Sequence, residues 1–122
     1  MKNKPELKLD SEGKCREAMN LVGALMYCKH AVLSMCDERD AYAMKAAVQL
    51  QTRLEDVSKH LHRYAFDIAS LECHSMRSKP SLKNSIRSLR GTCKEVESAL
   101  PTEMKAKLRS VSRELSAFAR CT

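Results

Sequence analysis

The stretch AYAMKAAVQLQTRLEDVSKHLHRYAFDIASL, residues 41–71, decides the fold of this chain of 122 residues. Its apolar residues alternate four and three positions apart without a break: Ala43, Ala47, Leu50, Leu54, Val57, Leu61, Tyr64, Ile68 and Leu71. This repeat of about 3.5 residues is typical of a helix that packs along one face against other helices. We therefore predict a long helix over residues 40–77, with Asp40 as its N-cap.

Three further segments carry a helical period, and we predict helices over residues 12–37, 80–99 and 102–120. Pro80 and Pro101 mark the starts of the last two, because proline suits the first turn of a helix and not its interior. The predicted buried face of the third helix consists of Leu82, Ile86, Leu89, Cys93, Val96 and Leu100. That of the fourth helix consists of Met104, Leu108, Val111, Leu115 and Phe118.

The first helix has a less regular apolar pattern, and Ser11 is a candidate N-cap for it. We predict that its buried face consists of Cys15, Met19, Val22, Met26, Leu33 and Cys36, widened by Ala18, Leu25 and Val32. Lys29 interrupts this face. The prediction therefore places the two methionines at positions 19 and 26 in the core.

Short connections between successive helices favour antiparallel neighbours. We predict an all-α fold, an antiparallel up-down four-helix bundle. Residues 1–10 are expected to form a flexible polar arm, and residues 11–122 a single domain made of a long hairpin (11–77) and a basic hairpin (78–122). The alternative is a helical hairpin that forms a homo-oligomer through the long helix. The residues predicted for that interface are Leu50, Leu54, Val57, Leu61, Tyr64 and Ile68.

The whole net charge of +7 lies in the C-terminal part of the chain. Residues 1–75 hold 11 Lys/Arg and 11 Asp/Glu, whereas residues 76–122 hold 11 Lys/Arg and four Asp/Glu. Eight of these cations follow the apolar faces of the last two helices at helical spacing: Lys83, Arg87, Arg90, Lys94, Lys105, Arg109, Arg113 and Arg120. They form one stripe on each helix, and we expect two antiparallel neighbours to bring both stripes to one face.

Charge that is segregated in this way indicates a surface that meets an acidic partner. We predict a small non-enzymatic interaction protein, an adaptor or regulator, whose eight cations dock on an acidic protein surface. One alternative is a nucleic-acid-binding regulator that contacts phosphates through the same residues, although an aromatic content of 4% offers little for base stacking. Another is that the long basic side chains only cover the edge of the core with their apolar stems.

The sequence contains no catalytic constellation and no clear metal-binding spacing, so we expect no enzyme, metal or cofactor. Its six cysteines include no Cys-x-x-Cys pair, and we expect reduced, inert thiols. The alternatives are a zinc site or a disulfide that involves Cys73 and Cys121, near His74 at one end of the bundle. His62 lies where a histidine-phosphotransfer module carries its histidine, but bulky residues follow it where such modules need small ones.

The chain also lacks the features of a membrane or exported protein. No apolar run approaches the roughly 20 residues that a membrane-spanning helix requires. The basic residues at the start are not followed by the apolar segment of a signal peptide. We therefore expect a cytoplasmic location and no binding to membranes.

Overall fold

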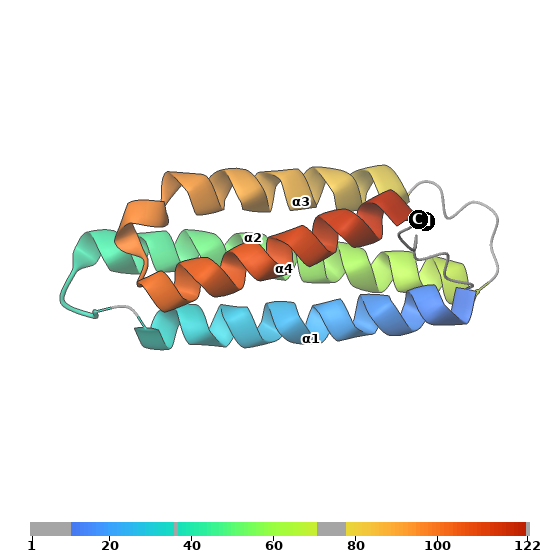
Figure 1. Cartoon of the computed structure of the whole chain (residues 1–122), viewed down its shortest axis with the longest axis horizontal. Helices are drawn as coiled ribbons and strands as arrows, with labels where there is room; N and C mark the ends of the chain where they lie inside the picture. The colour runs from blue at the N-terminus through green and yellow to red at the C-terminus, as the bar shows by residue number, and fades with distance from the viewer. Residues whose placement is uncertain (1–10, 36, 71–77, 122) are drawn as a thin grey trace, which may run out of the picture.

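The computed structural model describes residues 11–35, 37–70 and 78–121, and it shows four α-helices that pack as a bundle (Figure 1). The helices are α1 (Ser11–Met35), α2 (Ala41–Ala69), α3 (Ser78–Glu95) and α4 (Thr102–Cys121), and the short 3₁₀ helix η2 (Glu97–Ala99) joins α3 to α4. These described segments contain no strand. The predicted all-helical bundle is therefore confirmed, whereas the predicted arm at residues 1–10 lies outside the described residues.

The start of α2 is the predicted one, because Asp40 caps it. The carboxylate oxygen Oδ1 of Asp40 accepts hydrogen bonds from the backbone N–H groups of Tyr42, at 3.0 Å, and Ala43, at 3.2 Å. These two donors have no partner within the helix, so the side chain satisfies them. Pro101 directly precedes α4, and its carbonyl accepts the N–H of Lys105 at 3.0 Å, as the first carbonyl of a helix does.

Two helices end earlier than predicted. The helix α2 ends at Ala69 rather than at residue 77, and the hydroxyl of Ser70 donates to the carbonyl of Asp67 at 3.1 Å. The helix α3 ends at Glu95 rather than at residue 99, because the chain tightens into η2 before Pro101. Apolar spacing indicates which face of a helix is buried, but it does not mark the residue at which the helix ends.

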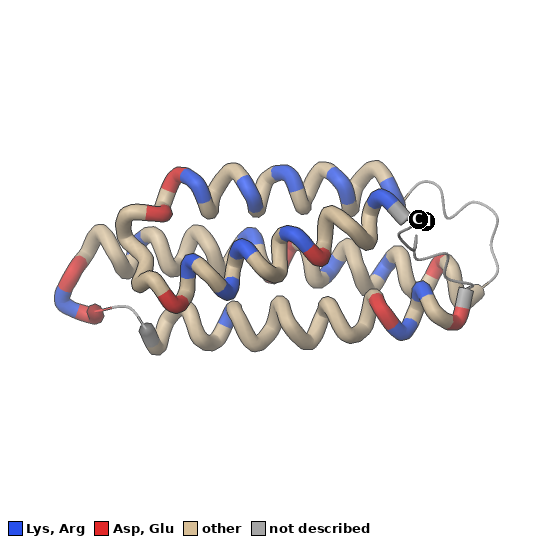
Figure 2. Tube along the Cα trace, in the orientation of Figure 1, with Lys and Arg blue, Asp and Glu red and all other residues tan. Residues whose placement is uncertain are grey.

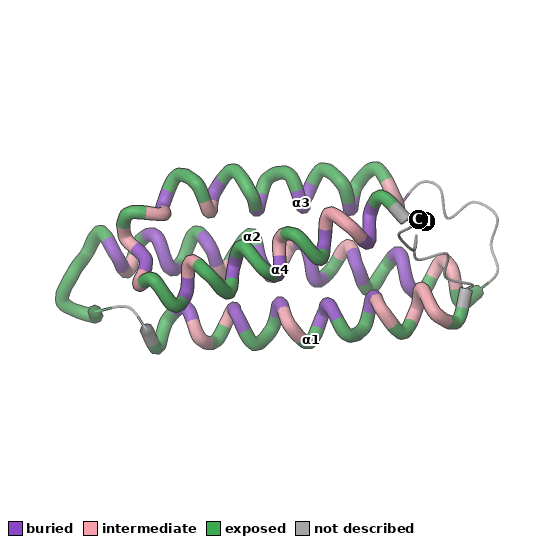
Figure 3. Tube along the Cα trace, viewed as in Figure 1, coloured by how far each residue is buried: buried purple, intermediate pink, exposed green. Residues whose placement is uncertain are grey.

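The core lies between all four helices, whose buried residues face the centre of the bundle (Figure 3). Leu50, Leu54, Val57 and Leu61 of α2 are completely buried. The predicted faces of α3 and α4 are buried as well, except that Cys93 is only partly covered. The ring of Tyr64 meets the ring of Phe118 edge to face, with centroids 6.1 Å apart, and so joins α2 to α4.

The predicted buried face of α1 is correct in part: Ala18, Val22, Leu25 and Val32 are buried as predicted, but the centre of the face is displaced by part of a helical turn. The structure buries Ala18, Leu21, Val22, Leu25, Cys28 and Val32, which also follow helical spacing, and Cys36 lies outside the described residues. Met19 is 46% exposed, and Met26 and Leu33 also face outward. The observed stripe packs against α2 and α4, and Lys29 lies at its edge. In the observed orientation the Lys29 ammonium reaches Glu55 at the surface, with 3.8 Å between Nζ and Oε1.

The proposed interface for a homo-oligomer is occupied by the chain itself. Leu50, Leu54, Val57, Leu61 and Tyr64 are buried in the core of the bundle, and Ile68 is packed against it. These side chains are therefore not available to a second copy of the folded chain. The bundle arrangement replaces the hairpin alternative because α1 and α3 flank α2 and α4 closes the core across from it, where Phe118 meets Tyr64.

Polar contacts fix how α1 and α3 lie against α2. The thiol of Cys15 donates to the carbonyl of Ala65 at 3.4 Å, and the amide of Gln51 donates to the carbonyl of Lys29 at 2.8 Å. On the other side of α2, the guanidinium of Arg53 donates to the hydroxyl of Thr92 in α3 at 3.3 Å. The helices α3 and α4 contact each other less extensively than α1 and α2 do. This looser contact leaves room for a groove between α3 and α4.

None of the helices in the described segments combines the length and the apolar character that crossing a lipid bilayer requires.

The corrected face of α1 can be tested by two substitutions that lie six residues apart on different sides of the helix. Leu25→Ala should lower the free energy of unfolding by about 2–5 kcal/mol, because it opens a cavity at a fully buried site. Met19→Ala should change it by about 0.5 kcal/mol or less, because the side chain is largely exposed. Urea denaturation of both variants measures the difference. Equal losses would support the face centred on the methionines.

Candidate functional site

A groove lies between α3 and α4. It has a volume of about 800 Å³ and is lined by seven basic side chains: Arg87, Arg90, Lys94, Lys105, Arg109, Arg113 and Arg120. A smaller hollow of about 230 Å³ adjoins it, shares Arg87, Arg90 and Arg120 with it, and adds Lys83. We call these two connected hollows the basic groove.

All eight cations that the sequence analysis selected therefore lie along one groove. Lys and Arg recur at regular intervals along both α3 and α4 (Figure 2). On α3 the four cations are spaced four, three and four residues apart, so that consecutive charges start about 5–6 Å apart along the helix. Helical spacing thus places the cations of α3 and the cations of α4 along the same groove. Their role in binding stays a prediction.

The uncharged lining of the basic groove, which we call its floor, includes residues that were not predicted as part of the site. Gly91 faces it from α3, and Ser112 and Ser116, one helical turn apart, face it from α4. A Cβ atom built at Gly91 would meet no atom within 4 Å, so this part of the wall is open. Leu100 and Leu108 add apolar surface to the lining. The spacing of the two serines, one turn apart beside the cations of α4, is the signal that could have identified this floor.

Most cations of the basic groove lack a partner of opposite charge. Within residues 78–121, Arg90, Lys94, Lys105, Arg113 and Arg120 form no salt bridge to a described residue. The exception is Arg109, whose Nη2 donates to Oε2 of Glu97 at 2.8 Å. Glu97 is the one acidic residue among those that line the groove. The groove therefore holds a strong excess of positive charge.

The positive charge extends to the start of α3. The pKa of Lys79 is lowered from its ordinary value, mainly by burial and then by the ammonium groups of Lys83 and Lys14. Arg87 is partly positioned by its own helix, because its guanidinium donates to the side-chain oxygen of Asn84 at 3.3 Å. Lys79 therefore lies near other positive charges, and Arg87 is held by a neutral amide group.

Cys93 lies at the junction of the basic groove and the core. Burial raises the pKa of its thiol to about 11, and Cys28 and Glu97 add to that increase. The pKa of Cys28 is also raised, because burial in α1 outweighs the opposing effect of Lys107. Both thiols are therefore protonated near neutral pH, which makes them poor nucleophiles and poor metal ligands. Cys28 was missed in the sequence analysis because it lies on the corrected face of α1.

The other candidates for chemistry are the cysteine and histidine residues that were considered for a metal site, a disulfide or phosphotransfer. In the described part of the chain, no three His, Cys, Asp or Glu side chains are close enough to hold a metal ion. Cys73 and His74, two of the residues considered for zinc or a disulfide, lie outside the described residues, and nothing is described of the side chain of Cys121. His62 is exposed, and the Nδ1 atom of His60 lies 2.9 Å from the carbonyl oxygen of Asp56.

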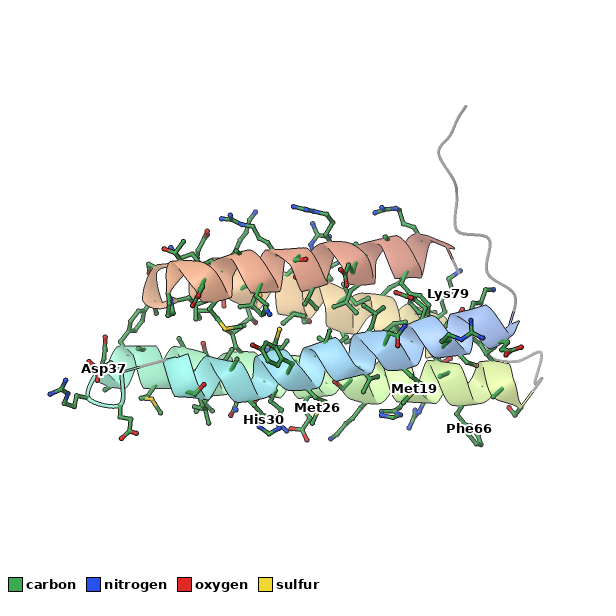
Figure 4. All side chains as sticks on the ribbon, turned by 60° about the horizontal axis from the view of Figure 1, so that its bottom comes forward. Met19, Met26, His30, Asp37, Phe66 and Lys79 are labelled. Carbon is green, nitrogen blue, oxygen red and sulfur yellow. The ribbon has the colours of Figure 1, made fainter. Side chains whose placement is uncertain are left out.

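An apolar strip on the α1–α2 side was also not anticipated. Met19 and Met26 of α1 and Phe66 of α2, which is 70% exposed, lie on the side of the bundle away from α3 and α4 (Figure 4). Leu33 and Val48 are further exposed apolar residues of these two helices. The strip is therefore separate from the basic groove.

Comparison with family models, curated proteins and solved structures finds no match to this chain.

Because the pKa of Cys93 is raised, the free energy of unfolding should depend on pH in the alkaline range. A thiol whose pKa is about 11 in the folded state and near 9 when unfolded stabilises the fold fully below pH 9. That contribution is lost as the pH rises from 9 to 11. The free energy of unfolding should therefore fall more steeply over this range in the native sequence than in Cys93→Ala, as urea denaturation measures. Parallel pH profiles would contradict the assignment, and a constant difference at pH 7 to 8 serves as the control.

Proposed function

We propose that this protein is a non-enzymatic adaptor or regulator that binds an acidic segment of another protein in the basic groove. The observation that supports this most directly is the convergence of eight cations from two helices, with a single acidic residue among them. An acidic segment supplies the missing negative charge. Complementary charge of this kind accelerates association and excludes partners of the wrong sign.

The form of the basic groove favours a polypeptide over a nucleic acid. Two packed helices lie about 8–10 Å apart, so the space between their side chains admits single side chains or one peptide segment. Acidic residues three or four positions apart on a partner helix are about 5–6 Å from each other, which matches the spacing of the cations on α3. The phosphates of a duplex lie on the outside of a wide cylinder, which meets the rim of such a groove and not its floor.

The lining of the groove supports the same choice. Among the described residues that line it, none is aromatic, so it offers no surface on which nucleic-acid bases stack. Its hydroxyl groups at Ser112 and Ser116 can donate hydrogen bonds to carboxylates, and Leu108 can contact the apolar part of a partner side chain. Binding to nucleic acid is therefore the alternative result that the binding experiment distinguishes.

Two further parts of the proposal concern topology and location. We infer an antiparallel up-down arrangement, which is supported by the contacts of Cys15 with Ala65 and of Lys29 with Gln51 and by the course of the chain in Figure 1. We also infer a cytoplasmic location. The free thiols at Cys28 and Cys93 support it, because the cytosol keeps thiols reduced.

The proposal is tested with a fluorescently labelled polyglutamate peptide at low ionic strength. Fluorescence anisotropy should show binding to the native sequence that weakens as salt is added. The triple variant Arg90→Gln, Lys94→Gln and Arg113→Gln should bind about tenfold more weakly, because it removes three cations of the groove.

The matched control removes the same amount of charge elsewhere. Lys45→Gln, Lys59→Gln and Arg63→Gln neutralise three exposed cations of α2, outside the basic groove, and should reduce affinity by about twofold or less. Equal losses in both variants would mean that net charge alone drives the association. Binding to duplex DNA or RNA with no binding to polyglutamate would overturn the proposal in favour of the nucleic-acid alternative.

A further inference from the structure

Glu97 occupies a distinctive position because it is an acid inside a basic groove. Its carboxylate accepts a hydrogen bond from Arg109 at 2.8 Å. The other acids of residues 78–121, namely Glu95, Glu103 and Glu114, are exposed and do not line the groove. The carboxylate of Glu97 is thus placed where the proposed partner would present its own.

The backbone holds Glu97 firmly at this place. It opens η2 between Val96 and Leu100, both of which are buried in the core. The N–H of Ala99 donates to the carbonyl of Val96 at 2.9 Å, and the N–H of Leu100 donates to the carbonyl of Glu97 at 3.2 Å. The main chain of Glu97 is therefore fixed by the core at one end of α3.

The side-chain contact is weaker than the backbone anchor. The side chain of Arg109 is 68% exposed and that of Glu97 is 44% exposed, so water competes with the ion pair on both sides. Exposed pairs of this kind contribute little net free energy and open readily. The carboxylate can consequently leave Arg109 without any disturbance of the core.

We infer that Glu97 is an internal competitor, whose carboxylate occupies the anion-binding position at Arg109 until a carboxylate of the acidic partner replaces it. The inference rests on the proposed function, and it identifies Arg109 as a point at which the partner's acid is bound. On binding, the Arg109 guanidinium exchanges one carboxylate for another, and the Glu97 side chain turns toward solvent. The competition lowers affinity and favours segments with enough negative charge to displace Glu97.

The test compares two substitutions that change the net charge equally. Glu97→Gln should raise the affinity for the labelled polyglutamate peptide about two- to fivefold, because it frees Arg109 and removes a negative charge from the groove. Glu114→Gln, outside the groove on α4, should raise it by about 1.5-fold or less. Urea denaturation confirms that both variants are folded.

A second comparison identifies the residue through which Glu97 acts. In an Arg109→Gln background, the gain from Glu97→Gln should fall to less than half of its value in the native background, because the contested position is missing and only the removal of a negative charge from the groove remains. Equal gains for the two glutamate variants in the native background, or a loss of affinity in Glu97→Gln, would overturn the inference while leaving the proposed function intact. If polyglutamate does not bind the native sequence at low salt, the proposed function fails and the inference fails with it.

Discussion

Burial of the apolar face of α2 is the constraint on which the other features depend. Leu50, Leu54 and Leu61 are fully buried, and covering them requires neighbours on both sides of α2 and a fourth helix across the remaining gap. The helices α1 and α3 take the two sides, and α4 closes the core through residues such as Leu115. Since α4 meets α3 less closely than α2 does, the outer edge between α3 and α4 stays open. The basic groove is a consequence of this order of packing.

The sequence predicts the buried faces well where each helix has only one apolar stripe. This holds for α2, α3 and α4, whose predicted faces are buried except for Ile68 and Cys93, which are partly covered, and Leu71, which lies outside the described residues. In α1 two neighbouring stripes have the same spacing, one through Met19 and Met26 and one through Leu21 and Leu25. Periodicity cannot choose between them, because both satisfy the repeat. The choice depends on which stripe packs against α2 and α4, and that becomes known only when those helices are in place.

The candidate site was predictable in its charges but not in its shape. The eight cations follow from helical phase alone, since they are displaced from the buried face by one position on α3 and by one or two positions on α4. The floor at Gly91 and Ser112 depends on how far apart α3 and α4 lie, which side-chain packing sets. The position of Glu97 depends on the unpredicted 3₁₀ helix between α3 and α4, because a continuous α-helix to residue 99 would place that side chain differently.

Coverage of the core by the stems of basic side chains does not by itself explain the basic groove. Stems of lysine or arginine shield apolar surface whatever the charge of their neighbours, so alternating acids and bases would cover the core equally well and without repulsion. The chain has 15 acidic residues, yet Glu97 is the one acid among the described residues that lines the groove. Clustering the cations adds like-charge repulsion, which destabilises the compact state. An anion between α3 and α4 would remove that repulsion, and this physical argument supports our proposal that the groove binds an acidic partner.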